Sequence, residues 1–127
     1  MKRTMPQSDE IDAIKTYMFL PLILSAFERD RRIFETLLKS PEPYIDLLTI
    51  AADKVTKDLT EVRRLFRERG IKVYEMERGQ AWIARYMCRG YTGDVTLWEQ
   101  LAIAEARVLM RKYLGIDTEK LWEYSRK

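Results

Sequence analysis

The stretch "EVRRLFRERGIKVYEMERGQAWIARYM", residues 61–87, decides the fold because its pattern of apolar residues changes at one glycine. Before Gly70 the apolar residues recur at helical spacing, and Arg67 and Arg69 lie where the last turn of a helix favours positive charge. After Gly70 the residues alternate and are rich in aromatic and β-branched side chains, which is typical of strands. An arginine-rich helix followed by a hairpin fits either a winged DNA-binding module or a helical protein that carries a hairpin.

The residues before this stretch favour one long helix over residues 40–70. Ser40 can cap its start, and Pro41 and Pro43 fall in the first turn, where no backbone donor is lost. The apolar residues that follow recur in alternating steps of three and four: Ile45, Leu48, Ala52, Val55, Leu59, Val62 and Phe66. A winged helix would need a break near Asp58, where the sequence has neither glycine nor proline. We therefore predict a continuous amphipathic helix and keep the winged helix as the alternative.

Residues 71–91 are predicted to form a two-stranded hairpin. Gly79 followed by Gln80 suits a two-residue type II′ turn, which needs glycine first. Pairing through this turn sets three cross-strand pairs: Ile71 with Cys88, Val73 with Tyr86, and Glu77 with Trp82. One face of the hairpin is then apolar, with Ile71, Val73, Trp82, Ala84, Tyr86 and Cys88. The other face is mixed, with Lys72, Tyr74, Met76, Ile83, Arg85 and Met87. Because a lone hairpin is marginally stable, its apolar face should pack on the helices.

The N-terminal part of the chain is predicted to be helical after a flexible start over residues 1–7. Apolar residues at helical spacing indicate a first helical segment over residues 8–39, which Pro21 should kink or split. The apolar run from Tyr17 to Phe27 is about half of the roughly 20 residues that a membrane-spanning helix needs. We therefore predict a buried helix here and no association with a membrane.

The C-terminal part is predicted to hold a third helix over residues 96–115. "YTGD" should end the second strand, and Thr96 followed by Glu99 resembles a capping box that opens a helix. The tail, residues 116–127, could add a short turn whose Leu121 and Trp122 dock on the body. The predicted fold class is α+β, mainly α, in one domain spanning residues 1–127.

The composition excludes several classes of chemistry. Among 127 residues, 46% are hydrophobic and 34% charged, as in soluble globular proteins, and the balance of 23 − 20 = +3 permits nucleic acid without demanding it. The chain has no histidine, the commonest general base, and its single cysteine, Cys88, leaves no disulfide framework and no cysteine-rich zinc site. No glycine-rich phosphate loop or nucleophile motif occurs. We predict no catalytic, cofactor-binding or metal site, no small-molecule substrate, and a cytoplasmic protein that is not an enzyme.

Two functions of different class remain open. The first is a non-enzymatic protein–protein interaction or assembly module that forms a homodimer, because the long helix is strongly amphipathic. Its interaction surface would be formed by apolar side chains of the hairpin: Tyr74, Met76, Trp82, Ile83 and Met87. The second is a nucleic-acid-binding regulator, in which basic side chains of the long helix and the hairpin contact phosphates or bases. Those side chains are Arg63, Arg64, Arg67, Lys72, Arg78 and Arg85.

Several segments resemble a family of small uncharacterised proteins from spore-forming Gram-positive bacteria. The segments are "YMFLPLILSAFERDRR", "PYIDLL", "KVTKDLTEVRRLFRERGIKVYE" and "RYMCRGY", and the resemblance covers residues 15–115. The family has no assigned activity, so the resemblance transfers no functional residue. It implies a bacterial cytoplasmic protein, with a role in sporulation or on a mobile element as the context to expect.

Overall fold

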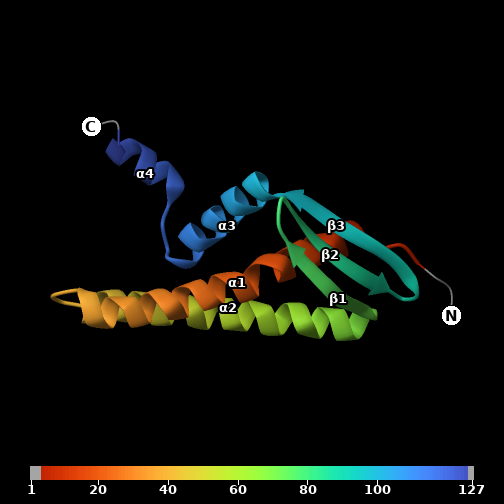
Figure 1. Cartoon of the computed structure of the whole chain (residues 1–127), viewed down its shortest axis with the longest axis horizontal. Helices are drawn as coiled ribbons and strands as arrows, with labels where there is room; N and C mark the ends of the chain where they lie inside the picture. The colour runs from red at the N-terminus through yellow and green to blue at the C-terminus, as the bar shows by residue number, and fades with distance from the viewer. Residues whose placement is uncertain (1–3, 126–127) are drawn as a thin grey trace.

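The structure, a computed structural model, describes residues 4–125 except for the side chains of residues 122, 124 and 125. Helices and strands follow one another as the predicted class requires, so the α+β, mainly helical fold is confirmed (Figure 1). Within the described residues the elements are α1 (Ser8–Leu37), α2 (Glu42–Arg69), β1 (Ile71–Arg78), β2 (Ala81–Cys88), β3 (Tyr91–Trp98), α3 (Glu99–Tyr113) and α4 (Thr118–Ser125).

The two long helices α1 and α2 form an antiparallel pair, which we call the arm (Figure 1). Of the two predicted alternatives for α1, a split does not occur, because the helix runs through Pro21 as one element. Figure 1 shows its first turns at an angle to the rest, as expected where proline removes a backbone donor. The buried residues of α1 and α2 belong to one hydrophobic core.

Helix α2 is continuous, as the spacing of its apolar residues predicts. Leu48, Val55 and Leu59 are all buried, and the helix ends where Gly70 adopts the left-handed conformation at φ 66°. The break near Asp58 that a winged helix needs does not occur. Asp58 instead accepts a hydrogen bond of 2.6 Å from the hydroxyl of Tyr113 at the end of α3.

The sheet has three antiparallel strands in the order β1-β2-β3, one more than predicted. "YTGD" continues as the edge strand β3 instead of ending the hairpin. The predicted capping box at Thr96 is therefore wrong, because Thr96 lies in β3 opposite Ile83. Helix α3 begins later than predicted, at Glu99, directly after Trp98 with its extended backbone.

The register of β1 against β2 is predicted correctly at one end and wrongly at the other. Ile71 lies opposite Cys88 and Val73 opposite Tyr86, as expected. A β-bulge between Val73 and Glu75 then adds a residue to β1, so the remaining pairs shift by one. Trp82 consequently pairs with Arg78 instead of Glu77. The type II′ turn is also wrong, because Gly79 is absent from the described glycines with positive φ.

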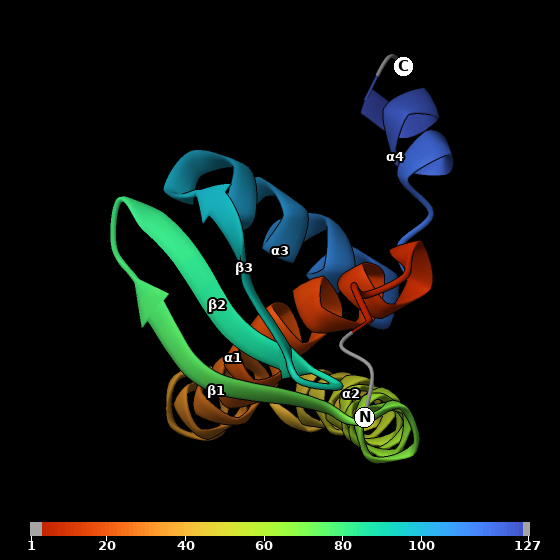
Figure 2. The ribbon, with the colours of Figure 1, turned by 90° about the vertical axis from the view of Figure 1, so that its right-hand side faces the viewer.

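The inward face of the sheet packs on the helices, as predicted for the apolar face. Figure 2 shows the sheet and α3 on the same side of the arm. The ring centroids of Trp82 and Phe19 lie 6.0 Å apart, so the sheet contacts α1 directly. The buried residues of this face are Ile71, Trp82, Ala84, Tyr86, Cys88, Val95 and Leu97.

The C-terminal tail forms a helix, α4, in place of the short turn that we predicted. Figure 1 shows α4 standing away from the arm. The side chain of Leu121 is 45% exposed. The side chain of Trp122 lies outside the described residues.

Candidate interaction surfaces

The predicted nucleic-acid-binding residues on α2 differ in their ion pairs. Arg63, Arg64 and Arg67 are all exposed on the solvent side of the helix. Arg64 is engaged, because its guanidinium pairs with Glu61 and lies 3.9 Å from Glu68. Within residues 4–125, Arg63 and Arg67 form no ion pair with another described residue. Two of the three arginines are therefore available to an anionic partner.

The predicted basic residues of the sheet lie on opposite faces. Arg78 covers the inward-facing Trp82, with 5.8 Å between its guanidinium carbon and the ring centroid. Arg85 faces outward between Glu75 and Glu77, at nitrogen–oxygen distances of 3.5 and 3.0 Å. The outward face holds two cations and three carboxylates, 2 − 3 = −1: Lys72, Arg85, Glu75, Glu77 and Asp94. It is therefore not the basic, aromatic platform that binds single-stranded nucleic acid.

Lys72 also borders a second surface, at the end of α2. It lines an open groove of about 670 Å³ together with Arg67, Met87 and Gly90. Lys72 is exposed, and among the described residues it has no ion pair. The six predicted cations thus divide among several surfaces, and Arg67 with Lys72 is the pair that shares one groove.

The predicted interaction surface on the hairpin is broken up. Trp82 is only 7% exposed, so it belongs to the core. Met76 lies opposite the inward-facing Ala84 because of the bulge, and not on the mixed face where we predicted it. This leaves Tyr74, Ile83 and Met87, of which Ile83 is half-buried. Their neighbours on the outward face include the ion pairs of Arg85, so the remaining apolar residues form no continuous patch.

A larger apolar surface, which the sequence did not predict, lies near the loop end of the arm. Helices α1 and α2 both contribute to it, and its side chains are 42 to 74% exposed. We call it the distal flank, and it consists of Ile33, Leu37, Tyr44, Leu47 and Ile50. The rings of Phe34 and Tyr44 meet edge to face at 5.9 Å and join the two helices there. Exposed apolar residues that lie together on a surface are typical of interaction sites.

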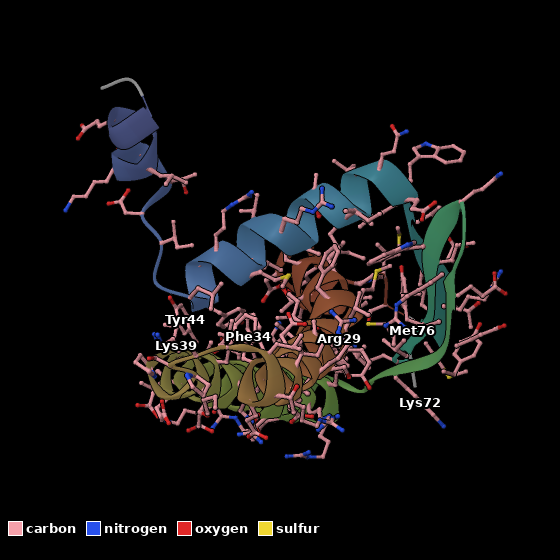
Figure 3. The ribbon with its side chains drawn as sticks, turned by 60° about the vertical axis from the view of Figure 1, so that its left-hand side comes forward. Arg29, Phe34, Lys39, Tyr44, Lys72 and Met76 are labelled. Atoms are coloured by element: carbon pink, nitrogen blue, oxygen red, sulfur yellow. The ribbon has the colours of Figure 1, made fainter. Side chains whose placement is uncertain are left out.

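The α2 part of the distal flank faces the side of the arm on which α3 lies. Leu47 precedes Asp58 by 11 residues, or about three turns, so both lie along one line of the helix. Asp58 is bonded to Tyr113 of α3. Leu47 therefore faces the same side, beyond the end of α3. Figure 3 shows the Tyr44 side chain on this side of the arm.

The α1 part of the distal flank faces the same side. Ile33 follows Lys15, and Leu37 follows Phe19, by 18 residues or about five turns of helix in each case. Lys15 and Phe19 line a groove of about 420 Å³ between α1 and α3, together with Val108. Helix α3 thus covers the half of this side of the arm that is nearer the sheet. The distal flank lies on the same side, in the half that α3 does not cover.

A buried carboxylate at the other end of the arm is held by two arginines. Glu10, 1% exposed, accepts hydrogen bonds of 2.8 and 2.9 Å from the two terminal nitrogens of Arg89. It also accepts a 2.8 Å bond from the backbone N–H of Gln7, and Arg69 Nη1 lies 3.6 Å away. Hydrogen bonding from Arg89 lowers the pKa of Glu10 to about 2, although burial opposes the shift. We interpret this base cluster of Glu10, Arg69 and Arg89 as structural, because its carboxylate is ionised and fully engaged.

Arg89 itself occupies a strained position. It forms a two-residue turn between β2 and β3 with Gly90, at φ 49° and 86°, which is typical of a type I′ turn. Side chains other than glycine rarely adopt positive φ. The cost is offset because Arg89 also donates to the carbonyl of Arg69 at 2.8 Å and to the hydroxyl of Thr4. The base cluster therefore ties together the chain start, the end of α2 and this turn.

Groups that could support catalysis are few in the described part of the chain. The Cys88 thiol is fully buried, and burial raises its pKa. Residues 4–125 hold no group of three or more Cys, Asp and Glu side chains arranged to bind a metal ion. None of the described helices is long and apolar enough to cross a membrane.

The fold and surfaces together define a mainly helical α+β protein whose two-helix arm carries a small sheet and an exposed apolar flank. The chain belongs to the family described as "YhjD protein", whose model matches residues 5–118. It is similar to the uncharacterised protein YhjD of Bacillus subtilis (strain 168), at 36% identity over 87 residues, which cover 67% of this chain and 72% of that relative. No solved structure matches. The resemblance to a small uncharacterised family from Gram-positive bacteria is thereby confirmed.

Proposed function

We propose that this chain is a non-enzymatic interaction module of the bacterial cytoplasm that assembles with a second copy of itself. The observation that carries the proposal is the distal flank, whose five large apolar side chains lie outside the core. Burying them against a partner would remove apolar area from water, which is the main favourable term in protein association. The mild net charge of +3 opposes self-association only weakly.

The proposal predicts a reversible homodimer in solution. Sedimentation equilibrium of the full chain from about 1 μM to about 500 μM should give a mass that rises from monomer to dimer. Because the contact is apolar, the dissociation constant should change little when salt is raised. A monomer mass across the whole concentration range would contradict the proposal.

Nucleic-acid binding is the second candidate, and the groove at the end of α2 favours it. Arg67 and Lys72 line this groove without an ion pair among the described residues, and Arg63 is exposed nearby on α2. Three cations would release about three counterions, so the slope of log affinity against log salt should be about −2 to −3. Fluorescence anisotropy with labelled duplex and single strands measures this slope.

A matched pair of arginine substitutions tests this second candidate. Arg67→Ala should weaken nucleic-acid binding, whereas Arg64→Ala should have little effect, because Arg64 is already engaged by Glu61 and Glu68. The absence of any anisotropy change at low salt and micromolar protein would remove nucleic acid as a partner.

A further inference from the structure

The groove at the end of α2 is lined by four cationic side chains, and two of them carry charges that no neighbour balances. Arg69 and Arg89 belong to the base cluster, where carboxylates of α1 balance them. The Glu68 carboxylate, which also lines the groove, lies 3.9 Å from an arginine of its own helix. Arg67 and Lys72 form no ion pair with another residue in the described part of the chain. Two positive charges therefore border one open space of about 670 Å³.

The negative end of α2 is covered by hydrogen-bond donors and therefore does little to repel an anion from this groove. A helix C-terminus carries about half a negative charge on its last carbonyl groups. The N–H of Gly70 bonds to the carbonyl of Phe66, and the backbone N–H of Arg89 bonds to that of Gly70 at 2.9 Å. The Arg89 side chain bonds to the carbonyl of Arg69 at 2.8 Å. The two unbalanced cations therefore decide which ligands the groove favours.

The groove also offers an apolar surface and room for a small organic group. Met87 lines it with a side chain that is 44% exposed. Gly70 and Gly90 line it as well, and glycine lets a ligand approach the backbone closely. The volume of about 670 Å³ lies in the range of roughly 300 to 1,000 Å³ that is usual for small-molecule sites.

We infer that this groove binds a phosphate monoester that is attached to a planar organic group. The inference rests on the groove of the second candidate function and names the chemical group that this groove selects. A monoester carries about −1.5 to −2 charge at pH 7 and three acceptor oxygens, so a single group balances both Arg67 and Lys72. A phosphodiester inside a strand carries one charge and would leave one of these cations unbalanced. The Met87 thioether makes favourable contacts with a planar ring.

A matched pair of lysine substitutions tests the site. Lys72 and Lys57 are both exposed, and Lys57 lies on α2 outside the groove, so glutamine at either position removes one charge and should leave the fold intact. At low salt we expect adenosine 5′-monophosphate to bind the full chain with a dissociation constant of about 0.1 to 1 mM. Lys72→Gln should weaken this binding about 10-fold, and Lys57→Gln should change it less than about 2-fold. Amide NMR titration measures the affinities and should shift the signals of Gly70 and Gly90.

Two further readouts separate the parts of the ligand. Met87→Ala should weaken binding of adenosine 5′-monophosphate about 3-fold or more and leave binding of inorganic phosphate within about 2-fold, because only the organic group contacts Met87. The second pKa of a phosphate monoester is about 6, and the chain has no histidine. The monophosphate should therefore bind about 3-fold tighter or more at pH 7.5 than at pH 5, whereas a dinucleotide with only a phosphodiester should change less than about 2-fold. An equal change for both ligands would contradict selection of the monoester.

The charged side chains around the groove bear on this pH comparison. They are Arg67, Glu68 and Arg69 of α2, Lys72 of β1, Arg89 of the β2–β3 turn, and Asp9 and Glu10 of α1. Lysine and arginine keep their charge over the whole interval. The carboxylates are present for both ligands, so the dinucleotide corrects for any change in them.

Labelled single strands distinguish a free monoester from one at a strand end. If the strand end is the source, a 5′-phosphorylated strand should bind about 10-fold tighter than the same strand with a 5′-hydroxyl. Equal binding of the two strands, with the free monophosphate still bound in the groove, would identify a small molecule as the source. Strand binding that ignores both the 5′-phosphate and Lys72→Gln, with no shift at about 10 mM monophosphate, would overturn this inference while nucleic-acid binding stands. Monophosphate binding without any strand binding would support the inference and remove the second candidate function.

Discussion

Replacing Glu10 by glutamine is expected to lower the free energy of unfolding at pH 7 by about 3 kcal/mol. The carboxylate is buried, and its pKa falls from an ordinary 4.5 to about 2, chiefly because Arg89 donates two hydrogen bonds to it. Each pKa unit corresponds to about 1.4 kcal/mol of preference for the ionised form in the folded state. An amide of the same shape keeps one acceptor oxygen but loses the charge, and it turns an NH₂ group toward the arginine. Urea unfolding monitored by circular dichroism measures the loss.

The pH dependence of stability gives an independent check on Glu10. Because the folded-state pKa is lowered, the contribution is fully present above about pH 5 and is lost as the pH falls toward about 2. Glu10→Gln should therefore flatten the stability curve in this window. Asp9→Asn is the matched control, since Asp9 contacts Arg69 at 3.0 Å but is exposed, and it should cost less than about 1 kcal/mol. Equal losses for both variants, with parallel pH curves, would mean that the base cluster is not the buried ion pair described above.

The base cluster also bears on how the distal flank is presented. Glu10 lies in the first turn of α1, Arg69 ends α2 and Arg89 lies in the turn between β2 and β3, so one set of bonds fixes both helices at the sheet end of the arm. The loop end, where the distal flank lies, is joined by a longer hydrogen bond of 3.4 Å from Arg31 to the Thr49 hydroxyl and by side-chain packing such as Phe34 against Tyr44. A second copy would therefore stabilise the end of the arm that has fewer fixed contacts of its own.

The parts of the fold that local pattern decides were predictable. The stripe from Leu48 to Phe66 persists without a break, and a helix that long follows from spacing alone. Strand β3 was missed because glycine and aspartate in "YTGD" are usual turn residues. Gly93 lies opposite Tyr86 in the sheet, and the register needed for that pairing is not visible from local composition. The bulge at Tyr74 changes the residue that pairs with Trp82 and moves Met76 to the inward face of the sheet. Nothing in the local sequence indicates this bulge.

The candidate surfaces were harder to predict, because exposure depends on where other elements stop. The apolar residues of the distal flank continue the helical pattern and could equally belong to a core. They are exposed because α3 ends at Tyr113, before it reaches Leu47. The Glu10–Arg89 pair joins residues 79 apart in sequence, and neither residue carries a motif. The acidic residues Glu75 and Glu77 are visible in the sequence, but their pairing with Arg85 depends on the register of β1 against β2.

Gly93→Ala is expected to lower the free energy of unfolding by about 2 to 3 kcal/mol. A Cβ atom at Gly93 would lie 2.6 Å from the Tyr86 hydroxyl oxygen and 2.8 Å from the adjoining ring carbon. Both distances are well inside van der Waals contact, and the Tyr86 side chain is buried, so it has little room to move. The backbone of Gly93 needs no positive φ, and the cost is therefore steric. Thermal and urea unfolding of the variant measure it.

A second glycine in the same sheet region separates this clash from a general effect of alanine. Nothing lies within 4 Å of a Cβ at Gly79, and its φ is not among the positive values, so Gly79→Ala should change stability by less than about 0.5 kcal/mol. Combining Gly93→Ala with Tyr86→Leu should cost less than the sum of the two single variants, because leucine removes the atoms that clash. Strict additivity in this cycle would show that Gly93 is required for some reason other than the Tyr86 ring. A loss confined to Gly93 and relieved at position 86 would instead show that the Tyr86 ring requires glycine opposite it in β3.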